Sequence, residues 1–204
     1  MQRRAFLLGA PATLLTACGA AEPTWAPDEF LNPRIYAFDG PPMLTLFTMR
    51  EEGGGQGAHT GLMINASQRV IFDPAGTFGH ESIPERNDVH YGISPQVEEY
   101  YETYHARITY YLYRQDKVVP APVAEQALRR AMTFGAVPKA QCARATSTIL
   151  SELPGFESIN VTWFPNALAR QFDRLPGVTS RERHETDSDD KTIARAAFDE
   201  QVAE

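Results

Sequence analysis

The sequence predicts an α+β protein with a small antiparallel sheet. Alternating or β-branched residues predict strands at 43–49, 58–64, 69–73 and 106–113. Apolar residues with helical spacing predict helices at 97–104, 123–134 and 142–153, and a further short helix after Pro165. The 204 residues, 43% of them hydrophobic, suffice for one domain with a core, and this composition excludes collagen-like, coiled-coil and wholly disordered classes.

Turn-forming residues separate the predicted strands. Pro41-Pro42 precedes the first strand, and the glycine-rich segment 52–57 is a loop before the second. Residues 65–68 are a short connection of the kind that joins the two strands of a hairpin. A long polar loop over 74–95 follows the hairpin.

Proline and glycine also end the predicted helices. Gly135 ends the helix at 123–134, and Pro154-Gly155 ends the next one. From Thr179 onward charged residues dominate, which predicts a solvated tail with an amphipathic helix at 193–202.

The N-terminus has the layout of an export signal. Arg3-Arg4 is followed by a short apolar stretch, which ends in Leu15-Thr16-Ala17-Cys18-Gly19. This segment resembles a bacterial lipobox, which implies cleavage before Cys18 and lipid attachment to that cysteine. The paired arginines also resemble the twin-arginine motif, so export by either the Tat or the Sec route is consistent with the sequence.

The expected organisation is a signal peptide at 1–17, a tether at 18–40, a domain at 41–178 and the charged tail at 179–204. Cleavage removes two arginines and no acidic residue, so the net charge changes from −7 to −9. Such an acidic chain is not expected to bind nucleic acid. We expect a monomer without a cofactor, held at the bacterial cell envelope by the lipid on Cys18 and facing the periplasm.

Cys142 is then the sole remaining thiol in a compartment where cysteines normally pair. It lies at the predicted start of a helix, where free backbone N–H groups favour a thiolate and could hold an oxyanion. Burial as a small hydrophobe among Ala143, Ala145 and Ile149 is the alternative.

His59 is the best-placed base for such a thiolate. It begins a predicted strand directly after the glycine loop, and alternation places Gly61 on the same face, leaving space beside the imidazole. A purely structural strand-end histidine is the alternative.

Asp73, at the end of the partner strand, is a candidate to orient His59. A three-residue loop at 65–67 would pair position 59 with 73 and place both side chains on one face, whereas a four-residue loop would turn Asp73 away. A simple strand-ending turn at Asp73-Pro74 is the alternative.

These segments resemble a known family. Residues 58–64, with a hairpin partner ending in a polar residue and with Gln141-Cys142-Ala143 later in the chain, are similar to the circularly permuted NlpC/P60 branch, which includes lecithin:retinol acyltransferase-like proteins. The resemblance implies a papain-like core with a nucleophile helix packed on the sheet. It also implies thiol hydrolase or acyltransferase chemistry on an amide, ester or thioester, such as a peptidoglycan peptide or an acyl-lipid. Gln141 stands where family members commonly have Asn or Ser, and its amide is a candidate to bind the oxyanion.

Two other functions fit parts of the sequence. A metal site could form from His80, Glu81, Asp88 and His90, although no ligand pair has the spacing typical of zinc sites. A catalytically inactive lipoprotein, using the same fold to bind a ligand or partner, would have an unreactive Cys142 distant from His59.

Overall fold

The computed structural model describes residues 20–203, and in them the protein is an α+β fold with a seven-stranded antiparallel sheet. The sheet order is β4-β5-β3-β2-β1-β6-β7. The strands are β1 (Met43–Glu51), β2 (Gly57–Asn65), β3 (Arg69–Phe72), β4 (Glu85–Arg86), β5 (Val89–Tyr91), β6 (Tyr110–Val118) and β7 (Thr179–Arg183). The helices are α1 (Asp28–Leu31), α2 (Pro95–His105), α3 (Ala121–Phe134), α4 (Cys142–Ser151), α5 (Pro165–Phe172) and α6 (Lys191–Ala203).

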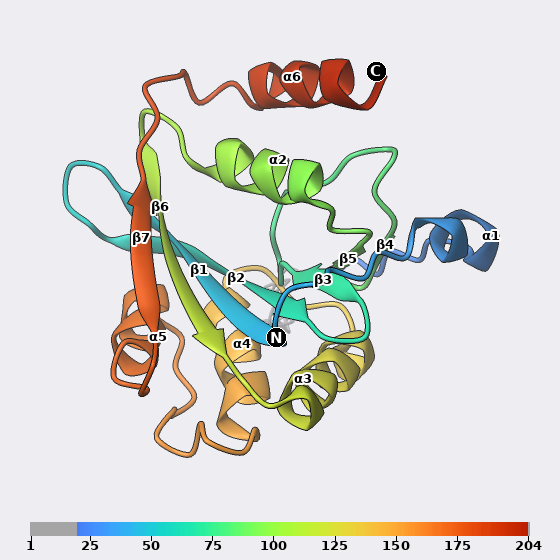
Figure 1. Cartoon of the computed structure of the whole chain (residues 1–204). Helices are drawn as coiled ribbons and strands as arrows, with labels where there is room; N and C mark the ends of the chain where they lie inside the picture. The colour runs from blue at the N-terminus through green and yellow to red at the C-terminus, as the bar shows by residue number, and fades with distance from the viewer. Residues whose placement is uncertain (1–19, 204) are drawn as a thin grey trace, which may run out of the picture.

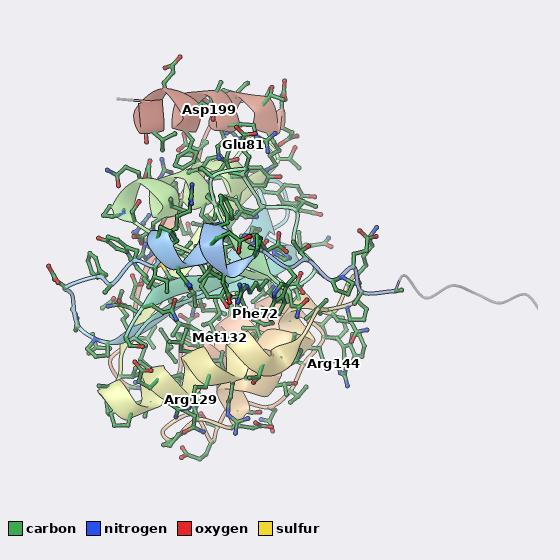
Figure 2. The ribbon with its side chains drawn as sticks, turned by 90° about the vertical axis from the view of Figure 1, so that its right-hand side faces the viewer. Phe72, Glu81, Arg129, Met132, Arg144 and Asp199 are labelled. Carbon is green, nitrogen blue, oxygen red and sulfur yellow. The ribbon has the colours of Figure 1, made fainter. Side chains whose placement is uncertain are left out.

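Helices cover both faces of the sheet (Figure 1). Helices α3, α4 and α5 pack on one face, and α2 with α6 outside it covers the other, so that Asp199 on α6 and Arg129 on α3 lie on opposite sides of the sheet (Figure 2). Strand alternation divides the core accordingly, because Leu62 and Ile64 belong to the α3–α4–α5 side and Met63 to the α2 side.

The predicted hairpin and most predicted helices are confirmed, but one strand is displaced. Helix α2 continues to His105, and β6 begins only at Tyr110 rather than at residue 106. Arg107 and Tyr110 instead close a turn through their backbone groups, and the Arg107 side chain is 1% exposed and paired with Asp187. Residues 106–109 therefore form the turn between α2 and β6 rather than the start of a strand.

The N-terminal segment is folded onto the domain and does not behave as a free tether from residue 24 onward. The backbone of Trp25 forms a bridge with Arg86, and the Ala26 N–H donates to the Glu85 carbonyl at 2.9 Å. Leu31 is 5% exposed. These few apolar residues within an Ala-, Pro- and Glu-rich stretch are enough to dock it.

The charged C-terminal segment is largely exposed, as expected, but it is not a free tail, and the amphipathic helix within it is present. Residues 179–183 form the edge strand β7, and Arg181 pairs with Glu102 of α2 at 2.6 Å. On α6, Phe198 stacks on Tyr100 of α2 with 4.5 Å between ring centroids. The charges are therefore neutralised by partners that are distant in the sequence.

The long loop after the hairpin is also partly ordered, since it contains β4 and β5. Among residues 20–203, no helix has the length and apolar character needed to span a bilayer. The predicted signal peptide and Cys18 lie outside the described residues.

Candidate active site

The site is built where the hairpin strand β2 begins. Gly57 lies so close to Pro165 and Asn166 of α5 that a side chain there would not fit. His59 follows two residues later, paired with Met49 of β1, and its side chain is 18% exposed. The packing of α5 against Gly57 thus fixes the strand end that carries the imidazole.

Asp73 is hydrogen-bonded to this imidazole. Its Oδ1 lies 2.8 Å from His59 Nε2, and the carboxylate itself is fully buried. Because Nε2 is bound to Asp73, Nδ1 is the ring nitrogen left for a nucleophile.

The position of the loop between β2 and β3 sets the register of the two strands, and the register brings Asp73 to His59. It has three residues, as one alternative required, but it spans 66–68, so that Asn65 pairs with Arg69 and Leu62 with Phe72. Continuing that register places position 73 opposite Gly61 rather than His59. The shift of two residues keeps Asp73 on the same face, so it contacts His59 as a diagonal neighbour.

Gly61 does not leave open space beside the imidazole, contrary to expectation. The hydroxyl of Tyr101 occupies that space and donates to Asp73 Oδ1 at 2.7 Å. A Cβ on Gly61 would lie 2.2 Å from this hydroxyl. Glycine is therefore needed here so that α2 can support the carboxylate across the strand.

Cys142 begins α4, which packs on β2, and the His59 imidazole lies near enough to its thiol to lower the thiol pKa. Strand β3 pairs with β2 only from Leu62 onward, which leaves the edge of β2 beside His59 without a strand partner. The helix end packs there, and the nearby backbone N–H groups of Thr60 and Ala143 lower the pKa of the Cys142 thiol. The residue is 6% exposed, so the nucleophile position is also well shielded.

The charges of the three groups depend on one another. Burial by itself would lower the pKa of His59, but the Asp73 carboxylate and the Cys142 thiol raise it well above the ordinary 6.5. Burial would raise the pKa of Asp73, yet His59 holds it below its usual range. Burial likewise opposes ionisation of Cys142, but His59 and the two N–H groups lower its pKa. The site therefore favours a thiolate beside an imidazolium.

Gln141 is the N-terminal flanking residue of α4, directly before the thiol. Its side-chain oxygen accepts a hydrogen bond from Arg144 Nη1 at 2.9 Å. The amide nitrogen is the group that remains for an oxyanion. The contact with Arg144 determines which end of the amide is available.

Two aromatic residues of the site were not singled out from the sequence. Tyr101 and His105 are four residues apart on α2 and therefore share a face. His105 Nδ1 contacts the Tyr101 carbonyl at 2.9 Å, and burial lowers the pKa of His105 to about 3, so its ring is neutral. The sequence signal for Tyr101 and His105 is their spacing of four residues on one helix face, combined with a glycine in the strand that this face covers.

His59, Asp73 and His105 are the described residues that could hold a metal ion, with one ligand atom each within 4.8 Å of one another. The two imidazole rings are stacked, with an interplanar angle of 21° and centroids 5.9 Å apart. A metal binds in the plane of an imidazole, so both rings would have to turn to share an ion.

The metal-site residues weighed from the sequence do not form one cluster. His80 bonds Ser82 and Asp199, whereas Asp88 accepts the N–H of Val137. His90 is buried and packs its ring against Phe78.

A pocket of about 240 Å³ opens beside the imidazole. It brings together residues from β1, β2, the loop after β3, α2 and α6 (Met49, Ala58, His59, Ala75, Gly76, Thr77, His105, Tyr110 and Lys191). Most of this wall is apolar, and Lys191 supplies a cationic group. The space is sufficient for part of a small acyl or peptide group next to the base.

No family model matches the chain, and no curated protein or solved structure matches it either.

Proposed function

We propose that this protein is a cell-envelope cysteine hydrolase or acyltransferase, held at the membrane by lipid on Cys18 and acting on an amide, ester or thioester. One observation carries the proposal: Asp73 binds His59 Nε2 at 2.8 Å, and the same imidazole lowers the pKa of the Cys142 thiol at the start of α4. Covalent acyl transfer requires a nucleophile, a base beside it and a carboxylate that orients the base, and Cys142, His59 and Asp73 supply these groups in that order. The order His59, Asp73, Cys142 along the chain supports assignment to the permuted NlpC/P60 branch of papain-like enzymes.

The chemistry follows from the charge state of the pair. The Cys142 thiolate attacks the carbonyl carbon, and the electron pair of the carbonyl bond moves to oxygen. In this mechanism, backbone N–H groups at the start of α4 and the Gln141 amide nitrogen stabilise the oxyanion. His59 then gives its proton to the leaving group as the bond to the carbonyl carbon breaks, which leaves an acyl-thioester on Cys142.

The second half-reaction regenerates the thiol. His59, now neutral, takes a proton from water or from an acceptor hydroxyl or amine, which attacks the thioester. Asp73 keeps the imidazole in one orientation throughout and stabilises its protonated form. Water as acceptor makes the protein a hydrolase, and another acceptor makes it an acyltransferase.

The test is the pH dependence of Cys142 alkylation by iodoacetamide, followed by peptide mass spectrometry. We expect labelling to rise with an inflection below the ordinary thiol pKa of about 8.5. His59→Ala should move this inflection to higher pH, whereas His184→Ala, which removes an exposed histidine bonded to Glu52, should not. Near-ultraviolet circular dichroism checks that each variant is folded.

A Cys142 that titrates as a free thiol in the folded wild type, with no change in His59→Ala, would contradict the catalytic proposal. The alternative, a non-catalytic lipoprotein that binds a ligand or partner, would then be favoured.

A further inference from the structure

Three apolar residues stand exposed in one short segment between α4 and α5. Val161, Trp163 and Phe164 are 51%, 53% and 70% exposed, and we refer to them together as the aromatic rim. Scattered exposed hydrophobics are ordinary on a protein surface. Three within four positions, two of them aromatic, make a compact apolar patch of the kind that marks an interaction site.

The aromatic rim is linked to the start of α4, which carries the candidate nucleophile, through Arg144. The Arg144 guanidinium is 5.2 Å from the centre of the Trp163 ring, and Arg144 also bonds Gln141, the residue before Cys142. On its other side the rim continues into Pro165, which packs against Gly57 near His59. The patch is therefore connected to residues that are near in sequence to both Cys142 and His59.

The start of the described chain lies on the other side of the same site. Ala20 lines a pocket with Gly76 and Lys139, and Gly76 also lines the pocket beside His59. The chain is tied down at Thr24, whose carbonyl accepts the Asn87 N–H at 2.9 Å. Figure 2 shows the beginning of the described chain and Arg144 on the same side of the molecule.

The distance from this anchor point to the lipid is short. Cys18 precedes Thr24 by six positions, so even a fully extended chain of about 3.5 Å per residue spans only about 21 Å. A lipid on Cys18 must therefore hold this side of the molecule close to the bilayer.

We propose that the aromatic rim docks on the lipid bilayer, so that the mouth of the Cys142 site opens onto the membrane surface. The proposal rests on the lipid attachment in the proposed function. Tryptophan and phenylalanine suit the membrane–water interface because a ring can enter the acyl boundary while polar groups stay hydrated. Lys139 and Arg144, which flank the site, supply positive charge toward anionic headgroups on a chain that is otherwise acidic. The bilayer, rather than a protein partner, is the occupant that the short tether brings to this face.

The docking has a consequence for the substrate. The lipid anchor keeps the protein at the membrane, and the rim sets its orientation, so that Cys142 meets carbonyl groups at the bilayer surface. Acyl compounds resident in the membrane then reach the thiol more readily than groups far from the bilayer.

Tryptophan fluorescence in vesicles tests the orientation, since the chain has two tryptophans. The lipidated protein is reconstituted into phosphatidylethanolamine–phosphatidylglycerol vesicles with and without brominated acyl chains. Trp25→Phe leaves Trp163 as the sole reporter. The matched control also carries Trp163→Phe and Val118→Trp, because Val118 is 59% exposed and pairs with Met43, at the other end of β1 from the partner of His59.

We expect the Trp163 reporter to be blue-shifted in vesicles and quenched by the brominated chains. The Val118→Trp reporter, about 20 Å farther along the sheet, should show neither change. Equal quenching of the two reporters, or no quenching of Trp163, would overturn the proposal. A blue-shifted Trp163 without quenching, in a protein that sediments as a dimer, would assign the rim to a protein interface and also overturn it.

These outcomes are separate from those that test the enzyme. Mass spectrometry of the N-terminal peptide reports the lipid on Cys18, and iodoacetamide labelling in detergent reports the thiol. A lipidated protein with a reactive Cys142 but an unquenched Trp163 overturns the docking alone.

Discussion

Gly61 is the position where the smallest change should have the largest effect on the site. In Gly61→Ala the new methyl group would lie 2.2 Å from the Tyr101 hydroxyl, whereas ordinary contacts begin at 3.4 Å. The hydroxyl must therefore retreat by about 1.2 Å, the difference between these distances. Its hydrogen bond to Asp73, 2.7 Å long, would be broken by such a shift.

The loss of stability in Gly61→Ala can be estimated from the contacts involved. Hydrogen bonds to a charged group contribute about 1.5–3 kcal/mol, and overpacking a buried site costs about 1–3 kcal/mol. Alanine is otherwise favoured over glycine in a strand by up to about 1 kcal/mol, which offsets part of this. We expect Gly61→Ala to lower the free energy of unfolding by about 2–5 kcal/mol.

Equilibrium urea unfolding of a double-mutant cycle is the assay. Tyr101→Phe removes the hydroxyl and so relieves the clash, and we expect Gly61→Ala to cost about 1 kcal/mol or less in that background. Gly79→Ala is the matched control, because nothing lies within 4 Å of a Cβ at that position. A Gly61→Ala protein as stable as the wild type, or additive effects of the two substitutions, would refute the reasoning.

Three further outcomes follow from the same contacts. Asp73→Asn should lower the pKa of His59 and move Cys142 alkylation to higher pH; an unchanged profile would show that the carboxylate does not support the imidazolium. Because the pKa of His59 is raised on folding, protonated His59 stabilises the folded protein fully below about pH 6.5, and this stabilisation is lost as the pH rises toward the folded-state pKa. The difference in free energy of unfolding between wild type and His59→Ala, measured in urea titrations, should therefore narrow from pH 6 to 9 and should not widen. Glu102→Gln, which leaves the buried Arg114 without one of its carboxylate partners, should lower the free energy of unfolding by about 3 kcal/mol, and a loss below about 1 kcal/mol in urea unfolding would count against the ion pair.

Local patterns were sufficient to predict much of the site. Alternation in 58–64 places His59 on one face of the sheet, and that prediction depends only on the period of two in any strand. The hairpin loop was assigned one residue too early, yet Asp73 still reaches His59 because a slip in register of two positions preserves the face. The helix start at Cys142 was equally readable, since proline and helical spacing bound that element.

Contacts between distant segments were not predictable in this way. The sequence shows that Tyr101 and His105 share a helix face, but only the packing of α2 over β2 places the Tyr101 hydroxyl against Gly61. The charged C-terminal segment has the composition of a solvated tail. Pairing of Arg181 with Glu102, 79 positions earlier, makes it part of the sheet edge.

The sequence by itself determined the hairpin of β2 and β3, most of the helices and the face of β2 that carries His59, because these depend on near neighbours along the chain. The tertiary structure alone decided that Asp73 contacts His59 diagonally, that Tyr101 fills the space beside the imidazole, and that the N-terminal segment docks against the strands next to the site. Each of these contacts joins segments that are distant in the sequence and that meet only because the two faces of the sheet are buried. A local sequence pattern does not indicate which distant segments pack together.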